Sequence, residues 1–136
     1  GIPAGVAAAL RFPDRQVFSL VGDGGALMTG SELATAMAQN AKVRVIVANN
    51  EHYGTIRYHQ ELHFPTRDHY ATKLVNPDFA KYGESFGLKC FTIEKIEEII
   101  PKIKEAMKVD GPSLIEFKMS LELNTSTTTI SQLQVK

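Results

Sequence analysis

The chain has 136 residues, and its 15 basic residues balance 15 acidic ones to a formal net charge of zero. This length predicts one domain with a sizeable core, and the balanced charge excludes strong attraction to nucleic acid or membrane surfaces. No apolar run approaches the roughly 20 residues of a membrane-spanning helix. The single cysteine, Cys90, excludes an internal disulfide and, with the lack of a signal-like segment, predicts a cytoplasmic protein.

The first part of the chain predicts a helix, a strand, a second helix and a second strand. In that order they cover residues 3–10, 16–21, 29–39 and 43–48. The second helix spaces its apolar side chains along one face. Thr29-Gly30-Ser31-Glu32 fits a capping box at its start, with a hydroxyl at the cap and a carboxylate three residues later.

Two short polar motifs follow the two strands at the point where each strand ends. Gly22-Asp23-Gly24-Gly25 comes after the first strand, and Asn49-Asn50 comes after the second. A strand–helix–strand unit makes a right-handed crossover, so both strand ends are expected at the same edge of one parallel sheet. Asp23 and Asn50 should therefore converge. Their carboxylate and amide oxygens suit Mg²⁺, which also takes waters, backbone carbonyls and phosphate oxygens.

The glycines of the first motif predict an anion site beside the metal. Gly24 and Gly25 have no side chains, so their N–H groups can approach an anion closely. They are expected just ahead of the helix of residues 29–39, whose N-terminus favours negative charge. A dinucleotide fingerprint would need glycine at Leu27, and no P-loop pattern occurs. The motifs together predict a magnesium–diphosphate site; the alternative is a tight turn and an ordinary strand end.

The second half of the chain again alternates helices and strands, which cover residues 76–86, 88–92, 94–108 and 113–119. Asn76 is the expected cap of the first of these helices, with Pro77 at its first position, and Gly87 is its expected stop. Pro101 predicts a kink or two short helices in the second. The alternation predicts an α/β fold, with three α/β/α layers around a mainly parallel, doubly wound sheet.

Residues 51–70 lack a regular pattern and are expected to border a pocket at the carboxyl edge of the sheet. A short helix is expected to start near Tyr53, and Pro65 should interrupt any regular structure beyond it. Residues 1–120 are expected to form the domain, and the Thr- and Ser-rich residues 121–136 a polar, flexible tail. The start without a methionine suggests a piece of a longer polypeptide.

The paired motifs resemble the cofactor motif of thiamine-diphosphate-dependent enzymes, over nearly the whole chain from about residue 1 to residue 120. The opening Gly1-Ile2-Pro3-Ala4-Gly5 and the segment of residues 49–57, which reads Asn-Asn-Glu-His-Tyr-Gly-Thr-Ile-Arg, look most like the acetolactate synthase branch. The resemblance implies the C-terminal, diphosphate-binding domain of such an enzyme, with thiamine diphosphate and Mg²⁺ as cofactors.

The resemblance also implies roles for particular residues. Asp23 and Asn50 would bind Mg²⁺ by their side chains, and His52 would bind it by its backbone carbonyl, which leaves the imidazole free to face the reaction. The amides of Gly24 and Gly25 would meet the diphosphate. The whole cofactor-binding set is Gly22, Asp23, Gly24, Gly25, Asn50, His52, Tyr53, Gly54 and Ile56. In this set Tyr53 and Ile56 either pack near the thiazolium ring or belong to an ordinary core.

By the same resemblance, the parent enzyme is a 2-oxo acid decarboxylase or carboligase that converts pyruvate to acetolactate. No catalytic residue is expected in this chain. The activating glutamate would come from a pyrimidine-binding domain of the same or the neighbouring subunit, in a homodimer or homotetramer. FAD would belong to a middle domain outside this chain. The chain alone is expected to be inactive; the alternatives are another 2-oxo acid decarboxylase of the family or a non-catalytic thiamine-diphosphate-binding module.

Four other side chains carry weaker hypotheses. His59 and His63 have the spacing of zinc ligands, but no H-E-x-x-H motif and no third ligand accompany them, which favours structural or substrate-facing roles. Arg57 is a candidate to hold a substrate carboxylate, against a solvated or domain-contact role. Cys90 lies on an apolar strand and is expected to be a small core residue.

Overall fold

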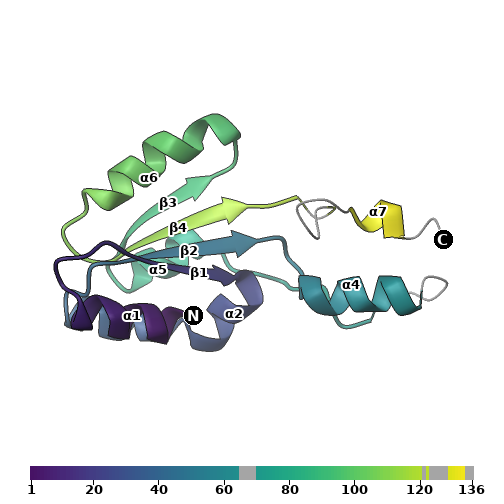
Figure 1. Cartoon of the computed structure of the whole chain (residues 1–136), viewed down its shortest axis with the longest axis horizontal. Helices are drawn as coiled ribbons and strands as arrows, with labels where there is room; N and C mark the ends of the chain where they lie inside the picture. The colour runs from purple at the N-terminus through teal and green to yellow at the C-terminus, as the bar shows by residue number, and fades with distance from the viewer. Residues whose placement is uncertain (65–69, 121, 123–128, 134–136) are drawn as a thin grey trace.

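The chain is organised around a four-stranded parallel sheet (Figure 1). The computed structural model describes residues 1–64, 70–120, 122 and 129–133. The strands stand in the order β1-β2-β4-β3, with bounds β1 Val17–Gly22, β2 Val43–Asn49, β3 Lys89–Ile93 and β4 Ser113–Lys118. All three pairings are parallel. The four predicted strands are confirmed, and their carboxyl ends share one edge of the sheet.

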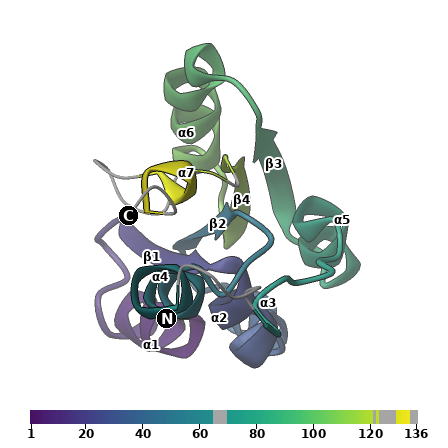
Figure 2. The same ribbon diagram turned by 90° about the vertical axis from the view of Figure 1, so that its right-hand side faces the viewer.

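Helices cover both faces of this sheet (Figure 2). The helices of the described ranges are α1 (Ile2–Arg11), α2 (Asp23–Thr29), α3 (Glu32–Ala38), α4 (Gly54–His63), α5 (Phe79–Ser85), the 3-10 helix η1 (Ile96–Glu98), α6 (Ile99–Met107) and α7 (Ile130–Leu133). Figure 2 shows α6 on one side of the sheet and α1, α2 and α3 on the other. The predicted α/β fold with three layers is therefore confirmed.

Two apolar clusters fill the spaces between the layers. The larger joins α1, α3 and α5 to the sheet and includes Phe79 and Leu114. The smaller joins α6 to β3 and β4 and includes Ala106 and Ile115. Leu114 and Ile115 are neighbours on β4, and they enter different clusters because successive strand residues point to opposite faces. β4 is thus buried on both faces as far as Glu116, whose carboxylate lies inside the fold.

The helix predicted over residues 29–39 is confirmed as α3, but its predicted start and its capping box are wrong. α2 begins at Asp23 and ends at Thr29, whose hydroxyl donates to the Gly25 carbonyl at 3.2 Å. α3 follows Ser31, which has helical backbone angles and makes no side-chain cap bond. The glycine motif therefore forms the first turn of α2, and it is not the loop directly before the predicted helix, α3.

The cap predicted for the helix of residues 76–86 is also wrong, although its end is right. Asp78, and not Asn76, caps α5, and its Oδ1 accepts the Lys81 N–H at 3.0 Å. At the far end, Gly87 has a φ of +92°, the left-handed conformation in which glycine commonly terminates helices. Asn76 does not cap the helix; its amide donates hydrogen bonds to Asp23 and Asn49.

The segment around Pro101 forms two short helices, as predicted. η1 is followed directly by α6, and Pro101 lies in the first turn of α6, where a missing N–H leaves no helical bond unmade. The Glu98 carboxylate accepts the Glu94 N–H at 2.9 Å and the Lys102 Nζ at 2.9 Å, and these bonds lower the pKa of Glu98 to about 2.

Some expectations concern residues outside the described ranges. The interruption predicted at Pro65 lies among them, as does most of the tail of residues 121–136. In the described part of that tail, α7 contains the buried Ile130 and lies against α4. Across the described ranges, no helix combines the length and hydrophobicity that a membrane crossing requires.

The Asp78 cap gives a pH-dependent stability prediction. Asp78→Ala should lower the free energy of unfolding by about 1 kcal/mol at neutral pH. The Lys81 N–H bond lowers the pKa of Asp78 in the folded state, so this contribution is complete above the unfolded pKa of about 3.9 and declines as the pH falls through the folded pKa. Urea unfolding at neutral and acidic pH measures it. Asp78→Asn, which keeps a cap acceptor, should retain the stability; an equal loss in both variants would contradict the prediction.

Candidate functional site

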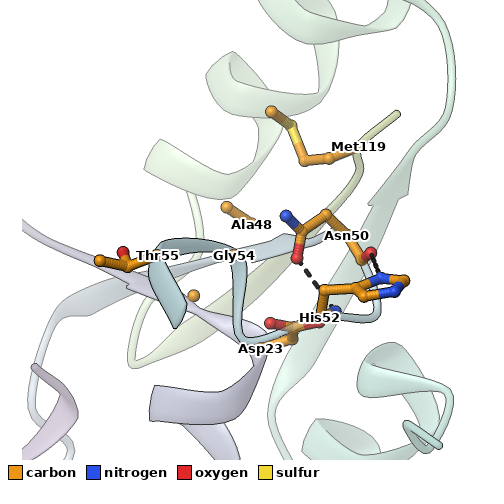
Figure 3. A pocket seen from close by; sticks show the side chains of 8 residues that line it. Asp23, Ala48, Asn50, His52, Gly54, Thr55 and Met119 are labelled. Atoms are coloured by element: carbon orange, nitrogen blue, oxygen red, sulfur yellow. Dashed lines mark hydrogen bonds between the residues drawn. The ribbon is translucent and has the colours of Figure 1, made fainter. Parts of the chain in front are cut away.

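The functional site lies where β1 and β2 end, at the carboxyl edge of the sheet. β1 and β2 pair in parallel, with Gly22 opposite Ala48, so the residues that follow each strand meet. Two adjoining pockets of about 260 and 240 Å³ open there. All the residues predicted to bind the cofactor line one or both of them: Gly22, Asp23, Gly24, Gly25, Asn50, His52, Tyr53, Gly54 and Ile56. Figure 3 shows the larger pocket, with Asp23, Asn50 and His52 around it.

Asp23 is the buried charge of this site. Its side chain is at the first position of α2, and the residue is only 2% exposed. Oδ1 accepts the Gly24 N–H at 2.9 Å, and Oδ2 accepts the Asn76 Nδ2 at 2.7 Å. Both donors are neutral, and no ion pair within the described ranges includes Asp23. A cation in the adjoining pocket would supply the compensating charge that a buried carboxylate requires.

The two asparagines that follow β2 have different environments. Asn49 is buried, and its Nδ2 donates to Glu116 Oε1 at 2.7 Å. Asn50 lines the larger pocket, and its Oδ1 accepts the His52 N–H at 3.2 Å. Successive residues leave an extended chain on opposite sides, which explains the division. Asn49 faces the fold and Asn50 faces the site.

The His52 imidazole is engaged, which corrects the expectation that it is free to face the reaction. Nδ1 lies 3.1 Å from the Asn50 carbonyl oxygen, and Nε2 lies 3.2 Å from Arg57 Nη1. Arg57 Nε is also 3.6 Å from Glu61 Oε1, and the Arg57 side chain is only 11% exposed. Arg57 is therefore not the solvated residue considered as one alternative. Its predicted contact with a substrate carboxylate stays a prediction.

A short antiparallel contact holds His52 in place. His52 and Lys73 form an antiparallel bridge. The Tyr53 N–H donates to the Thr72 carbonyl, and the Leu74 N–H donates to the Glu51 carbonyl, both at 2.8 Å. These bonds fix the backbone of residues 51–53, including the carbonyl that was predicted to bind metal. α4 starts immediately afterwards at Gly54.

The glycines meet two different steric conditions. A Cβ on Gly24 would collide with the aromatic ring of Tyr53, whereas a Cβ on Gly22 or Gly25 would meet nothing within 4 Å. Gly24 therefore permits close packing of α2 against Tyr53, and Gly22 and Gly25 leave open space at the pocket. The Gly24 N–H already donates to Asp23 Oδ1, so its contact with a diphosphate stays a prediction.

The donors around the larger pocket fit a hard metal ion. Asp23 offers a carboxylate, Asn50 an amide oxygen and His52 a backbone carbonyl, which are oxygen ligands of the kind that Mg²⁺ prefers. Within the described ranges, no three His, Cys, Asp or Glu side chains form a metal-binding group. His59 and His63 stack on each other, with ring centroids 5.9 Å apart.

The family comparison agrees with this geometry. The model described as "Thiamine pyrophosphate enzyme, C-terminal TPP binding domain" matches residues 1–117. The chain belongs to the thiamine pyrophosphate enzyme family.

Members of this family with different reactions are similar to the chain. It is 39% identical over 118 residues to a 3D-(3,5/4)-trihydroxycyclohexane-1,2-dione hydrolase of Bacillus licheniformis, covering 81% of this chain and 18% of the relative. It is 34% identical over 119 residues to the mitochondrial acetolactate synthase catalytic subunit of Saccharomyces cerevisiae, covering 88% of this chain and 17% of the relative. The chain thus spans less than a fifth of the length of either relative.

A solved structure of the family shares the fold. The thiamine diphosphate-dependent 4-hydroxybenzoylformate decarboxylase of Rhodococcus jostii RHA1 superposes with a TM-score of 0.82 at 32% sequence identity. The match covers 88% of this chain and 23% of that chain. The arrangement of strands and helices described above is therefore that of a thiamine pyrophosphate enzyme domain.

Two hydrogen-bonding residues behind the site were missed by sequence reasoning, as were the pocket-lining residues Ala48, Thr55 and Met119. Asn76 was assigned to a helix cap, but its amide reaches Asp23 and Asn49. Glu116 was counted only as part of a strand, although it is fully buried and accepts from Asn49. Only Glu116 carried a usable signal, since a carboxylate between the apolar residues Ile115 and Phe117 of a strand requires a partner if it is buried.

Two glycine variants of this thiamine pyrophosphate enzyme domain should differ in stability. Gly24→Ala should lower the free energy of unfolding by about 1–3 kcal/mol, because the new methyl group forces Tyr53 to move. Gly25→Ala should leave it unchanged or raise it by up to about 1 kcal/mol, because alanine favours the helix and its Cβ meets open space. Denaturant unfolding of both variants without cofactor measures the difference. Equal stabilities would show that Tyr53 does not constrain Gly24.

Proposed function

We propose that this chain is the diphosphate- and magnesium-binding domain of a thiamine-diphosphate-dependent 2-oxo acid decarboxylase or carboligase. One observation carries the metal site: the buried Asp23 carboxylate has only neutral partners within the described ranges and borders a pocket with two further oxygen donors. The family match to residues 1–117 supports the identity of the cofactor. An acetolactate synthase-like reaction, from pyruvate to acetolactate, is the form that we favour.

The proposed ligand roles follow the lining of the two pockets. Asp23 and Asn50 bind Mg²⁺ through their side chains, and His52 binds it through its backbone carbonyl. The glycines at positions 22, 24 and 25 leave room for the diphosphate beside the metal. Tyr53, Gly54 and Ile56 line the smaller pocket and are proposed to lie near the thiazolium end of the cofactor.

The relatives support a common chemistry more strongly than a particular substrate. The R. jostii enzyme is named for decarboxylation of an aryl 2-oxo acid, the yeast enzyme for acetolactate synthesis and the Bacillus enzyme for hydrolysis of a cyclic 1,2-dione. Bound thiamine diphosphate supplies an electron sink for breaking or forming bonds next to a carbonyl. The residues of this chain hold and orient the diphosphate and its metal. Another 2-oxo acid decarboxylase activity therefore remains the alternative.

The rest of the active site is proposed to lie outside this chain. We assign no catalytic side chain to it, and we place the activating glutamate on a pyrimidine-binding domain of the same or a neighbouring subunit. Such an arrangement calls for a homodimer or homotetramer, and any FAD would occupy a separate domain. We place the protein in the cytoplasm, because its single cysteine, Cys90, is free and suits a reducing compartment.

Calorimetric titration of thiamine diphosphate into the chain, with and without Mg²⁺, tests the proposed site. Asp23→Ala should abolish the Mg²⁺-dependent binding, because it removes the only charged ligand of the set. His52→Ala should retain that binding, because the substitution keeps the backbone carbonyl. Retained binding would exclude the imidazole as a required ligand and agree with the carbonyl.

The opposite outcomes are also specific. Binding of wild-type chain that is indifferent to both Mg²⁺ and Asp23→Ala would overturn the metal–diphosphate site. Loss of metal-dependent binding in His52→Ala would show that the site requires the imidazole or its contacts with Asn50 and Arg57. Binding without turnover by a complete protein that carries the pyrimidine domain would favour the non-catalytic module over the enzyme.

A further inference from the structure

Asn76 connects the ends of the two strands that form the metal site. Its Nδ2 lies 2.7 Å from Asp23 Oδ2 and 2.8 Å from Asn49 Oδ1. An amide nitrogen carries two hydrogens, so it can donate one to each oxygen. Asn76 is 53 residues from Asp23 and 27 from Asn49 in the sequence. One side chain therefore links three distant segments beneath the pocket.

The direction of these hydrogen bonds is fixed by a buried carboxylate at the other end of the network. Glu116 is fully buried, and its Oε1 accepts from Asn49 Nδ2 at 2.7 Å and from Lys118 Nζ at 2.7 Å. Since an ionised carboxylate only accepts, Asn49 must turn its nitrogen toward Glu116 and its oxygen toward Asn76. Asn76 must then donate to Asn49, and its second N–H is directed at Asp23.

We propose that Asn76 is a positioning residue for the metal-binding carboxylate of Asp23. This inference rests on the proposed function of the site. Asn76 and the Gly24 N–H each occupy one oxygen of Asp23, which fixes the carboxylate plane while lone pairs on both oxygens stay available to a metal. Partners that orient metal ligands are commonly required for full metal affinity. Asn76 performs this positioning through the side-chain N–H that it donates to Asp23 Oδ2.

The competing explanation is that Asn76 only holds the loop before α5. Asp78 provides the matched control, because it lies two residues further along and its carboxylate caps α5 through the Lys81 N–H. Asp78→Ala should disturb the loop and the helix start without removing a bond to Asp23. A comparison of the two variants therefore separates metal positioning from loop stability.

The experiment measures the Mg²⁺ concentration that half-saturates thiamine diphosphate binding in the whole chain. Asn76→Ala should raise this concentration about 10- to 100-fold, while saturating Mg²⁺ restores the affinity for thiamine diphosphate. Asp78→Ala should leave it within about threefold of wild type while lowering the unfolding midpoint. Asn76→Ser, which keeps one short donor, should fall between wild type and Asn76→Ala and serves as the readout if the alanine variant does not fold.

Each outcome has a defined meaning. Failure to bind thiamine diphosphate with Mg²⁺ even in a complete protein that carries the pyrimidine-binding domain would overturn the proposed function, and the positioning role with it. Metal-dependent binding by wild type with an unchanged Mg²⁺ requirement in the Asn76 variants would overturn the positioning role alone. An equal rise in the Mg²⁺ requirement for Asp78→Ala would likewise assign Asn76 to loop stability.

Discussion

The parallel pairing of β1 with β2 is the constraint on which the whole site depends. It sets Gly22 opposite Ala48, so that Asp23 and Asn50 both follow closely after the last paired positions of their strands. A shift of one residue would exchange the two faces of β2. Asn49 would then turn toward the pocket and Asn50 toward the fold. The register therefore decides which asparagine is available to a metal and which one supports the structure.

Burial of the Asp23 and Glu116 carboxylates explains why each has polar hydrogen-bond partners inside the fold. An unpaired buried charge is strongly unfavourable, and a hydrogen bond to a charged group contributes about 1.5–3 kcal/mol. Glu116 has a cationic partner in Lys118, and the bond between them raises the pKa of Lys118. Asp23 has neutral donors only in the described ranges. Glu116 is thus neutralised by Lys118 within the chain, whereas Asp23 has no cationic partner within the described ranges.

Sequence reasoning found the strands and the convergence of the site because both follow from periodic patterns and chain topology. Four apolar runs predicted the four strands, and the crossover rule brought Asp23 to Asn50. It failed at two helix starts, where a residue with the side chain of a good cap does not cap the helix. Thr29 and Asn76 both have the side chains of good caps, but Thr29 lies at the end of α2 and Asn76 is drawn to Asp23.

Long-range hydrogen bonds account for the rest of what the sequence did not reveal. Asn49 and Glu116 are 67 residues apart, and no local pattern relates them. Only the order β1-β2-β4-β3 places β4 beside β2, with Asn49 opposite Lys118. That order was not predicted, because parallel strands of similar composition carry no local mark of their neighbour. The supporting layer of the site therefore required the fold, whereas most of the residues that line the two pockets did not.

The site has one part that is held by many hydrogen bonds, at the strand ends, and another part, α4, that projects from the sheet. The strand ends, the contact between residues 51–53 and 72–74, and the Asn76 amide hold the proposed metal ligands on several sides. α4 extends away from the sheet between these anchor points (Figure 1), and its Ile56 is 53% exposed beside the smaller pocket. Changes at Ile56 can alter that pocket without removing any of these anchors, whereas Arg57 on the same helix contacts the His52 imidazole. This separation offers a physical reason why one cofactor-binding domain serves relatives with different reactions.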